Sequence, residues 1–174
     1  MNNKRPVALL IVALTMLNGC DNVSTEDDPG SVADLCQNIF ELCISPILQG
    51  PIGAASVSCA SSSCHTSGGS GGAFILLQNP VTPSDFAFNF NSAQAFVNPA
   101  SVSQSKLLAE PLVGDSGVPS VGPHGGGDIF NSTAATCYQE MLQWAQTPNG
   151  SCGAGCAVLP AGGPMPADLA ACAP

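Results

Sequence analysis

Charge is scarce in this sequence, and positive charge is the scarcest. Charged residues make up 9% of the 174 residues, with 12 acidic side chains against 3 basic ones. So few charges exclude coiled coils and long solvated helices, which carry rows of charged side chains. The formal net charge of -9 also argues against nucleic-acid binding, because that affinity comes mostly from Lys and Arg on phosphates.

Aromatic residues and histidines are also few: the chain has one Trp, one Tyr and two His. Glycine and proline are abundant instead, at 19 and 15 residues, so we expect loops to hold much of the chain. No phosphate-binding loop is present, and no Ser, His and Asp residues fall in an obvious catalytic arrangement. We therefore expect no catalytic residues.

Nine cysteines in so short a chain indicate an oxidising compartment, and their odd number means that at least one does not pair internally. Lys4 and Arg5 precede an apolar run that ends in Leu-Asn-Gly-Cys20. This pattern predicts an export signal over residues 1–19, too short to span a membrane, and it resembles the lipobox of bacterial lipoproteins. We expect Cys20 to be lipidated and residues 20–31 to form an acidic flexible tether; the alternatives are an ordinary cleaved signal or a spanning anchor.

Two segments show helical periodicity. Val32, Leu35, Ile39 and Leu42 predict an amphipathic helix that starts after Ser31 and ends near Pro46. A second helix is expected from about Ser132 to Gln146, with Trp144 beside its apolar stripe. Between them we expect a brief helix over Ser103–Glu110 and, from Phe86 to Phe96, a loop and short helix whose rings face the core.

Cys36 and Cys43 lie on one face of the first predicted helix, about 10.5 Å apart at 1.5 Å per residue, beyond disulfide reach. Each must therefore bond toward the last helix or the tail and join the two ends of the fold. Six cysteines are candidates for three such disulfides: Cys36, Cys43, Cys137, Cys152, Cys156 and Cys172.

The segment that points to a chemical function is Cys59-Ala-Ser-Ser-Ser-Cys64-His65. Cys-x-x-Cys-His marks covalent haem attachment, in which two thiols add to the porphyrin and the adjacent His ligates iron. Here four residues separate the cysteines, which matches the rarer Cys-x4-Cys-His variant. Two alternatives remain open: a Cys59–Cys64 disulfide with His65 as bystander, and a zinc site from Cys59, Cys64, His65 and His124.

The surrounding sequence resembles monohaem cytochrome c domains of bacteria over about residues 32–146. The matching segments, in order, are Ser45-Pro46-Ile47-Leu48, Cys59 to His65, Asn98-Pro99 with Ser105 to Leu108, His124-Gly-Gly-Gly with Phe130, and Tyr138 with Trp144. The resemblance implies an all-α, small cytochrome c-like fold over residues 32–147. Its N- and C-terminal helices would cross near Phe40 and Trp144, and long Gly/Pro-rich loops would surround the haem. Residues 148–174 would be a Cys-rich, disulfide-stapled extension.

By the same resemblance the chain binds one covalent haem c through Cys59 and Cys64, with His65 as proximal and His124 as distal iron ligand. Met141 and Met165 are the alternative distal ligands. The expected function is electron transfer by a lipid-anchored carrier on the periplasmic side of a membrane or on the outer cell surface. Its redox partner would present a basic docking patch. The alternatives are a disulfide-rich surface lipoprotein that binds a partner without a cofactor, and a haem peroxidase.

Overall fold

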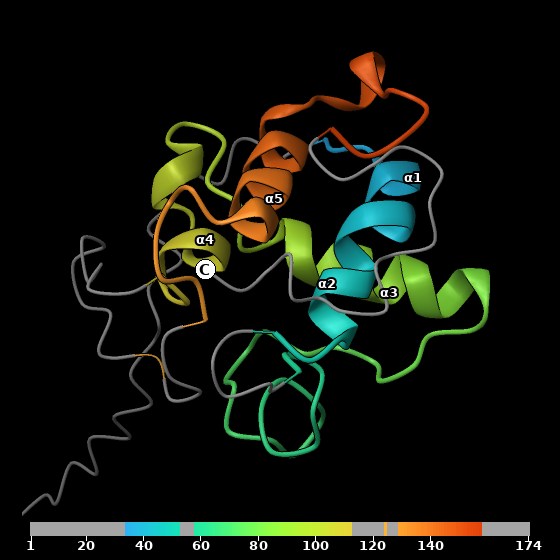
Figure 1. Cartoon of the computed structure of the whole chain (residues 1–174). Coiled ribbons are helices and arrows are strands. Elements are labelled where there is room, and N and C mark those ends of the chain that lie inside the picture. The colour runs from blue at the N-terminus through green and yellow to red at the C-terminus, as the bar shows by residue number, and fades with distance from the viewer. Residues whose placement is uncertain (1–33, 53–57, 113–123, 125–128, 158–174) are drawn as a thin grey trace, which may run out of the picture.

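The computed structural model describes residues 34–52, 58–112, 124 and 129–157 (Figure 1). The expected signal peptide and tether, Cys20, Met165 and Cys172 lie outside these ranges. The described part is helical and contains no strand, only the isolated bridges Leu35–Pro148 and Leu112–Phe130. An all-α chain with long loops is therefore correct at the level of secondary structure. No described helix is long and apolar enough to cross a membrane.

The first helical stretch is built from three consecutive segments: α1 (Gln37–Ile39), the π-helical η1 (Phe40–Ile44) and α2 (Ser45–Gln49). The prediction that this helix ends near Pro46 is wrong, because the chain stays helical up to Gly50. Pro46 lies in the first turn of α2, where its missing N–H breaks no hydrogen bond. Immediately before Pro46 the helix has a wider π turn, in which the Ser45 N–H donates to the Phe40 carbonyl. The π turn also shifts the buried face, so Leu42 is 57% exposed instead of in the core.

The segment with most of the phenylalanines forms α3 (Pro83–Gln94), which is longer than the predicted short helix. Its start is fixed by a capping box: the Thr82 side chain accepts from the Asp85 N–H, and the Asp85 carboxylate accepts from the Thr82 N–H. Residues two apart point to opposite sides of a helix. Phe90 is therefore buried while Phe88 is 46% exposed, so the prediction that all these rings face the core is wrong for Phe88.

Two further helical pieces follow, η2 (Val102–Gln104) and α4 (Lys106–Ala109). They replace the single helix predicted from Ser103 to Glu110. The break falls at Ser105, which is extended in backbone conformation, and its buried hydroxyl accepts a hydrogen bond from the Asn98 N–H at 2.8 Å. A serine side chain that bonds a nearby backbone N–H competes with helical hydrogen bonding, which is consistent with the interruption at Ser105.

The last helix, α5 (Thr136–Gln146), packs beside the first helical stretch and is followed by the short η3 (Asn149–Ser151) (Figure 1). It ends where predicted but begins four residues later than Ser132. The predicted contact between Phe40 and Trp144 is confirmed: their ring centres are 5.5 Å apart, and Phe90 of α3 lies 5.6 Å from Phe40. The Trp144 indole N–H also donates to the Cys36 carbonyl at 3.1 Å. Three helices thus meet around one aromatic cluster.

Two disulfides tie the segment after α5 to the first helical stretch: Cys36–Cys152 and Cys43–Cys156. They confirm that Cys36 and Cys43 bond to the tail and not to each other. Cys137 is disulfide-bonded as well. The tail is held further by a hydrogen bond from the Asn149 N–H to the Asp34 carbonyl at 2.8 Å. Disulfides of this kind are typical of an oxidising, exported compartment.

Candidate functional site

Cys59, Cys64 and His65 lie on the loop that follows α2, below the helices in Figure 1. The loop closes on itself, because the His65 N–H donates to the Cys59 carbonyl at 3.0 Å and the Cys64 N–H donates to that of Ser61. Ser62 and Ser63 are exposed. The extra residues of the Cys-x4-Cys-His motif therefore extend toward solvent, while the main chain at Cys59 and His65 stays hydrogen-bonded.

Cys59 and Cys64 are free thiols, and both are half-buried. The other five described cysteines are all disulfide-bonded. Burial, with a smaller contribution from the neighbouring Cys64, raises the pKa of the Cys59 thiol to about 12. Cys59 thus stays protonated at neutral pH, which disfavours thiol–disulfide exchange. Among the described cysteines, the unpaired ones are the two that precede His65 in this motif.

The imidazole of His65 is held in one orientation by the backbone. Its Nδ1 lies 3.0 Å from the Phe74 carbonyl oxygen, so Nδ1 carries the proton and donates, and Nε2 is the unprotonated nitrogen. Burial lowers the pKa of His65, and the hydrogen bond to Phe74 only partly opposes this. A neutral ring with a free Nε2 is the form of histidine that binds metals.

Two glycines let the loop wrap around this histidine. A Cβ on Gly71 would lie 2.2 Å from His65 Nδ1, and one on Gly69 would lie 2.2 Å from the Cys64 carbonyl oxygen. The Gly71 N–H also donates to the Cys64 carbonyl at 2.8 Å. Any side chain at either position would push the main chain away from the motif, so the glycines are needed for close approach.

The second histidine of the sequence faces the first. The ring centres of His65 and His124 are 6.0 Å apart, and their planes are inclined by 17°. The rings are stacked, so the structure brings together the two histidines that the resemblance names as iron ligands. Most of the Gly-rich segment around His124 lies outside the described residues.

Apolar side chains line the motif on the inner side of the loop. The Phe74 ring lies 4.7 Å from that of His65 and 5.2 Å from that of Phe96, and Leu76, close to Phe74 in sequence, is buried. Met141, the alternative distal ligand, is buried on α5 in the core of the protein. No sequence pattern points to Phe74, because it holds His65 through a backbone carbonyl, for which side-chain identity carries no signal.

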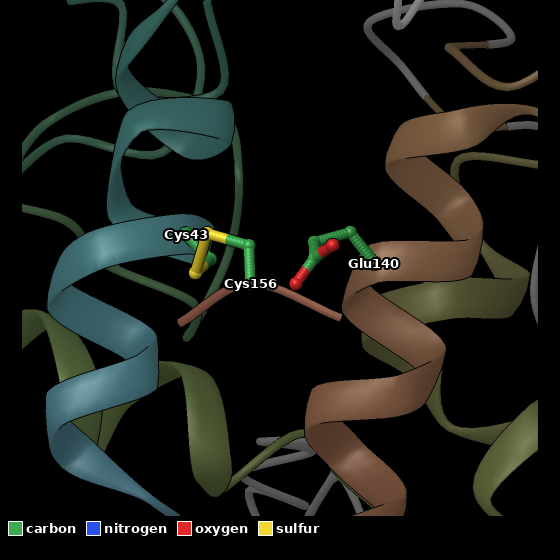
Figure 2. A group of neighbouring side chains, drawn as sticks. All are labelled: Cys43, Glu140 and Cys156. Atoms are coloured by element: carbon green, nitrogen blue, oxygen red, sulfur yellow. A yellow bond between two sulfur atoms is a disulfide. The ribbon is translucent and has the colours of Figure 1, made fainter. Parts of the chain in front are cut away.

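Three potential ligand atoms gather more tightly elsewhere. Cys43, Glu140 and Cys156 each place one potential ligand atom within 4.8 Å of the other two (Figure 2). Within the described ranges this is the group of three His, Cys, Asp or Glu side chains that come so close. Two of these are sulfurs of one disulfide, which offers no thiolate to a metal. No three of Cys59, Cys64, His65 and His124 come this close among the described atoms, so the structure does not assemble the zinc site considered from the sequence.

Comparison with known proteins gives no match: no protein-family model, no curated protein and no solved structure resembles the chain at a significant level.

Proposed function

We propose that this chain is a monohaem c-type cytochrome with a small cytochrome c-like fold that carries single electrons. The observation that carries the proposal is the pairing of His65 and His124, with rings 6.0 Å apart, next to two thiols left free in a disulfide-bonded protein. When bound, haem would supply the one-electron Fe(III)/Fe(II) couple. The protein residues would hold it through thioethers at Cys59 and Cys64 and through the two imidazoles.

Each residue has a distinct part in this proposal. The Phe74 carbonyl keeps the proton of His65 on Nδ1, so that Nε2 is the ligating atom. Addition of a thiol across a vinyl group forms one C–S bond and transfers the thiol hydrogen to carbon. It requires no oxidant but does require that Cys59 and Cys64 be reduced, as they are here. Phe74 and Phe96 would supply an apolar wall that excludes water.

If His65 and His124 both held the haem iron, the haem would supply electron transfer and not peroxide chemistry, which needs an open position on iron. His124 is the proposed distal ligand in preference to Met141, because His124 faces His65 whereas Met141 lies in the packed core with Trp144. The proposal therefore makes the protein a carrier and not an enzyme.

The test is the spectrum of the full chain expressed in a host that exports and matures c-type cytochromes. We expect haem to remain on the polypeptide in denaturing electrophoresis and the reduced protein to show a low-spin spectrum. Cys59→Ser with Cys64→Ser should lose covalent haem, and His124→Ala should lose the low-spin spectrum. Met141→Leu is the matched control and should leave the spectrum unchanged. A colourless protein that keeps its disulfides would refute the proposal and favour the cofactor-free surface lipoprotein.

The location and partner are part of the same proposal. A lipid on Cys20 would tether the protein to a membrane, and after Cys20 the chain keeps one basic residue, Lys106, beside all 12 acidic ones. Such a charge balance favours a redox partner with a basic docking patch and a salt-sensitive encounter. Labelling with a radioactive fatty acid, lost in Cys20→Ser, tests the lipid. An electron-transfer rate independent of ionic strength would contradict the docking model.

A further inference from the structure

Glu140 is a fully buried carboxylic acid next to a disulfide. It lies on α5 with 0% of its surface exposed, and its side chain points from the helix toward Cys43 and Cys156 (Figure 2). A carboxylate oxygen and the two sulfurs all lie within 4.8 Å of one another. Glu140 Oε1 also accepts a hydrogen bond from the Ala157 N–H at 3.0 Å, directly after Cys156. The proposed haem site does not include this residue.

The two sulfurs of this disulfide are not equally accessible. Cys43 is fully buried, whereas Cys156 is half-buried. A thiol reductant must therefore attack Cys156 Sγ, forming a mixed disulfide there and expelling Cys43 Sγ as a thiolate with the bonding electron pair. That thiolate would form in a buried place beside the carboxylate of Glu140. Burial and a neighbouring negative charge both disfavour a thiolate, and a poor leaving group leaves slowly.

We propose that Glu140 protects the Cys43–Cys156 disulfide against reduction by thiols. The Cys36–Cys152 disulfide is an internal comparison, because Cys36 is as deeply buried as Cys43 and Cys152 is half-buried like Cys156. Its sulfurs contact neutral oxygens, those of Pro148 at 3.4 Å and Asn149 at 2.8 Å. Among the described residues no carboxylate lies within 4.8 Å of both its sulfurs. The carboxylate of Glu140 near both sulfurs thus distinguishes Cys43–Cys156 from Cys36–Cys152.

This protection does not depend on haem, but it has a use if haem is attached. Thioether formation requires Cys59 and Cys64 to be thiols in the same oxidising compartment where the structural disulfides form. A dithiol reductant that keeps the first pair reduced would also meet the disulfides that close the fold. Glu140 would let the chain tolerate that reductant while Cys43–Cys156 stays oxidised.

The experiment measures the reduction rate of each disulfide in the folded, full-length protein. Dithiothreitol is added under native conditions, free thiols are trapped by alkylation at intervals, and each cysteine is quantified by mass spectrometry. We expect Cys43–Cys156 to be reduced more slowly than Cys36–Cys152, and Glu140→Gln to speed its reduction by about tenfold. The rate at Cys36–Cys152 should not change. Glu41→Gln is the matched control, since Glu41 is a partly exposed acid two residues from Cys43 on the same helical stretch.

Two further variants separate charge from packing. Glu140→Asp disturbs the packing but keeps the charge, so it should protect the disulfide better than Glu140→Gln does. In a Cys156→Ser background, thiolate absorbance should show a lower pKa for Cys43 when Glu140 is replaced by Gln. Equal reduction rates in the wild type and Glu140→Gln, or an unchanged Cys43 pKa, would overturn the proposal. Neither readout involves haem, so failure here is distinct from failure of the cytochrome proposal.

Discussion

Replacing Gly71 with Ala should displace His65 from the position in which the loop holds it. The added Cβ would lie 2.2 Å from Nδ1 and 2.7 Å from Cε1 and Cγ of the imidazole. Ordinary contacts begin near 3.4 Å, so the ring and the loop must separate by about 1.2 Å in total. Because the ring lies against Phe74 on another side, the 3.0 Å hydrogen bond from Nδ1 to the Phe74 carbonyl should break.

The cost can be estimated from the contacts that are lost. One partly buried hydrogen bond contributes about 1 kcal/mol, and overpacking at a tight contact costs about 1–3 kcal/mol more. We therefore expect Gly71→Ala to reduce the free energy of unfolding by about 2–4 kcal/mol. Gly72→Ala is the matched control: Gly72 has φ +67, but nothing lies within 4 Å of its Cβ position. It should cost only about 1 kcal/mol of backbone strain and leave His65 in place.

The assay combines denaturant unfolding with nitrogen-15 NMR of the histidine rings. Wild type and Gly72→Ala should show His65 as the Nδ1–H tautomer, and Gly71→Ala should show a tautomer mixture. In the haem-loaded protein Gly71→Ala should weaken or alter the low-spin spectrum that histidine ligation is expected to give. If Gly71→Ala leaves the tautomer and the stability as in Gly72→Ala, the inference that the loop orients His65 through this close approach is refuted.

Three further predictions concern stability. Replacing Cys36 and Cys152 together by Ser while Cys43–Cys156 stays intact opens only the short ring between the two disulfides, because Cys36 lies close to Cys43 and Cys152 close to Cys156 in sequence. The change should cost about 3 kcal/mol of unfolding free energy, measured by guanidinium titration, and a loss below about 1 kcal/mol would contradict the chain-entropy argument. Trp144→Phe keeps the ring contact with Phe40 but leaves the buried Cys36 carbonyl without its indole donor, so it should lower stability by about 1–2 kcal/mol, again by denaturant titration. The pKa of His65 is lowered in the folded state, so the unfolded state takes up a proton first as pH falls. The free energy of unfolding of the haem-free protein should therefore decrease as pH drops below 6.5. His65→Asn should flatten this decrease between about pH 7.5 and 5, and the same pH dependence of unfolding free energy in both proteins would contradict the prediction.

Local pattern was enough for several features of this protein. The sequence correctly predicted that Cys36 and Cys43 do not bond to each other, but the helix that was expected to hold both begins only at Gln37, and Cys36 precedes it in an extended conformation. The stripe around Tyr138 and Trp144 located the last helix. These predictions succeed because they depend on residues within a few turns of one another.

The errors have the opposite cause. Pro46 normally ends a helix, yet here a π turn just before it lets the chain continue, and the altered register turns Leu42 outward. The buried face of α5 was also underestimated. Glu140 is buried and accepts a hydrogen bond from the Ala157 N–H of the disulfide-bonded tail, and an acidic residue in a helix carries no sign of such a cover.

By itself the sequence determined the helical class, the chemistry-bearing motif from Cys59 to His65, and the rule that Cys36 and Cys43 must bond elsewhere. Only the tertiary structure decided which tail cysteines they meet, that His124 faces His65, and that Glu140 is buried beside a disulfide. Each of these joins residues far apart along the chain, at separations of up to 116 for the disulfides. Such contacts arise from how the helices and loops pack against one another, a property that no local spacing encodes.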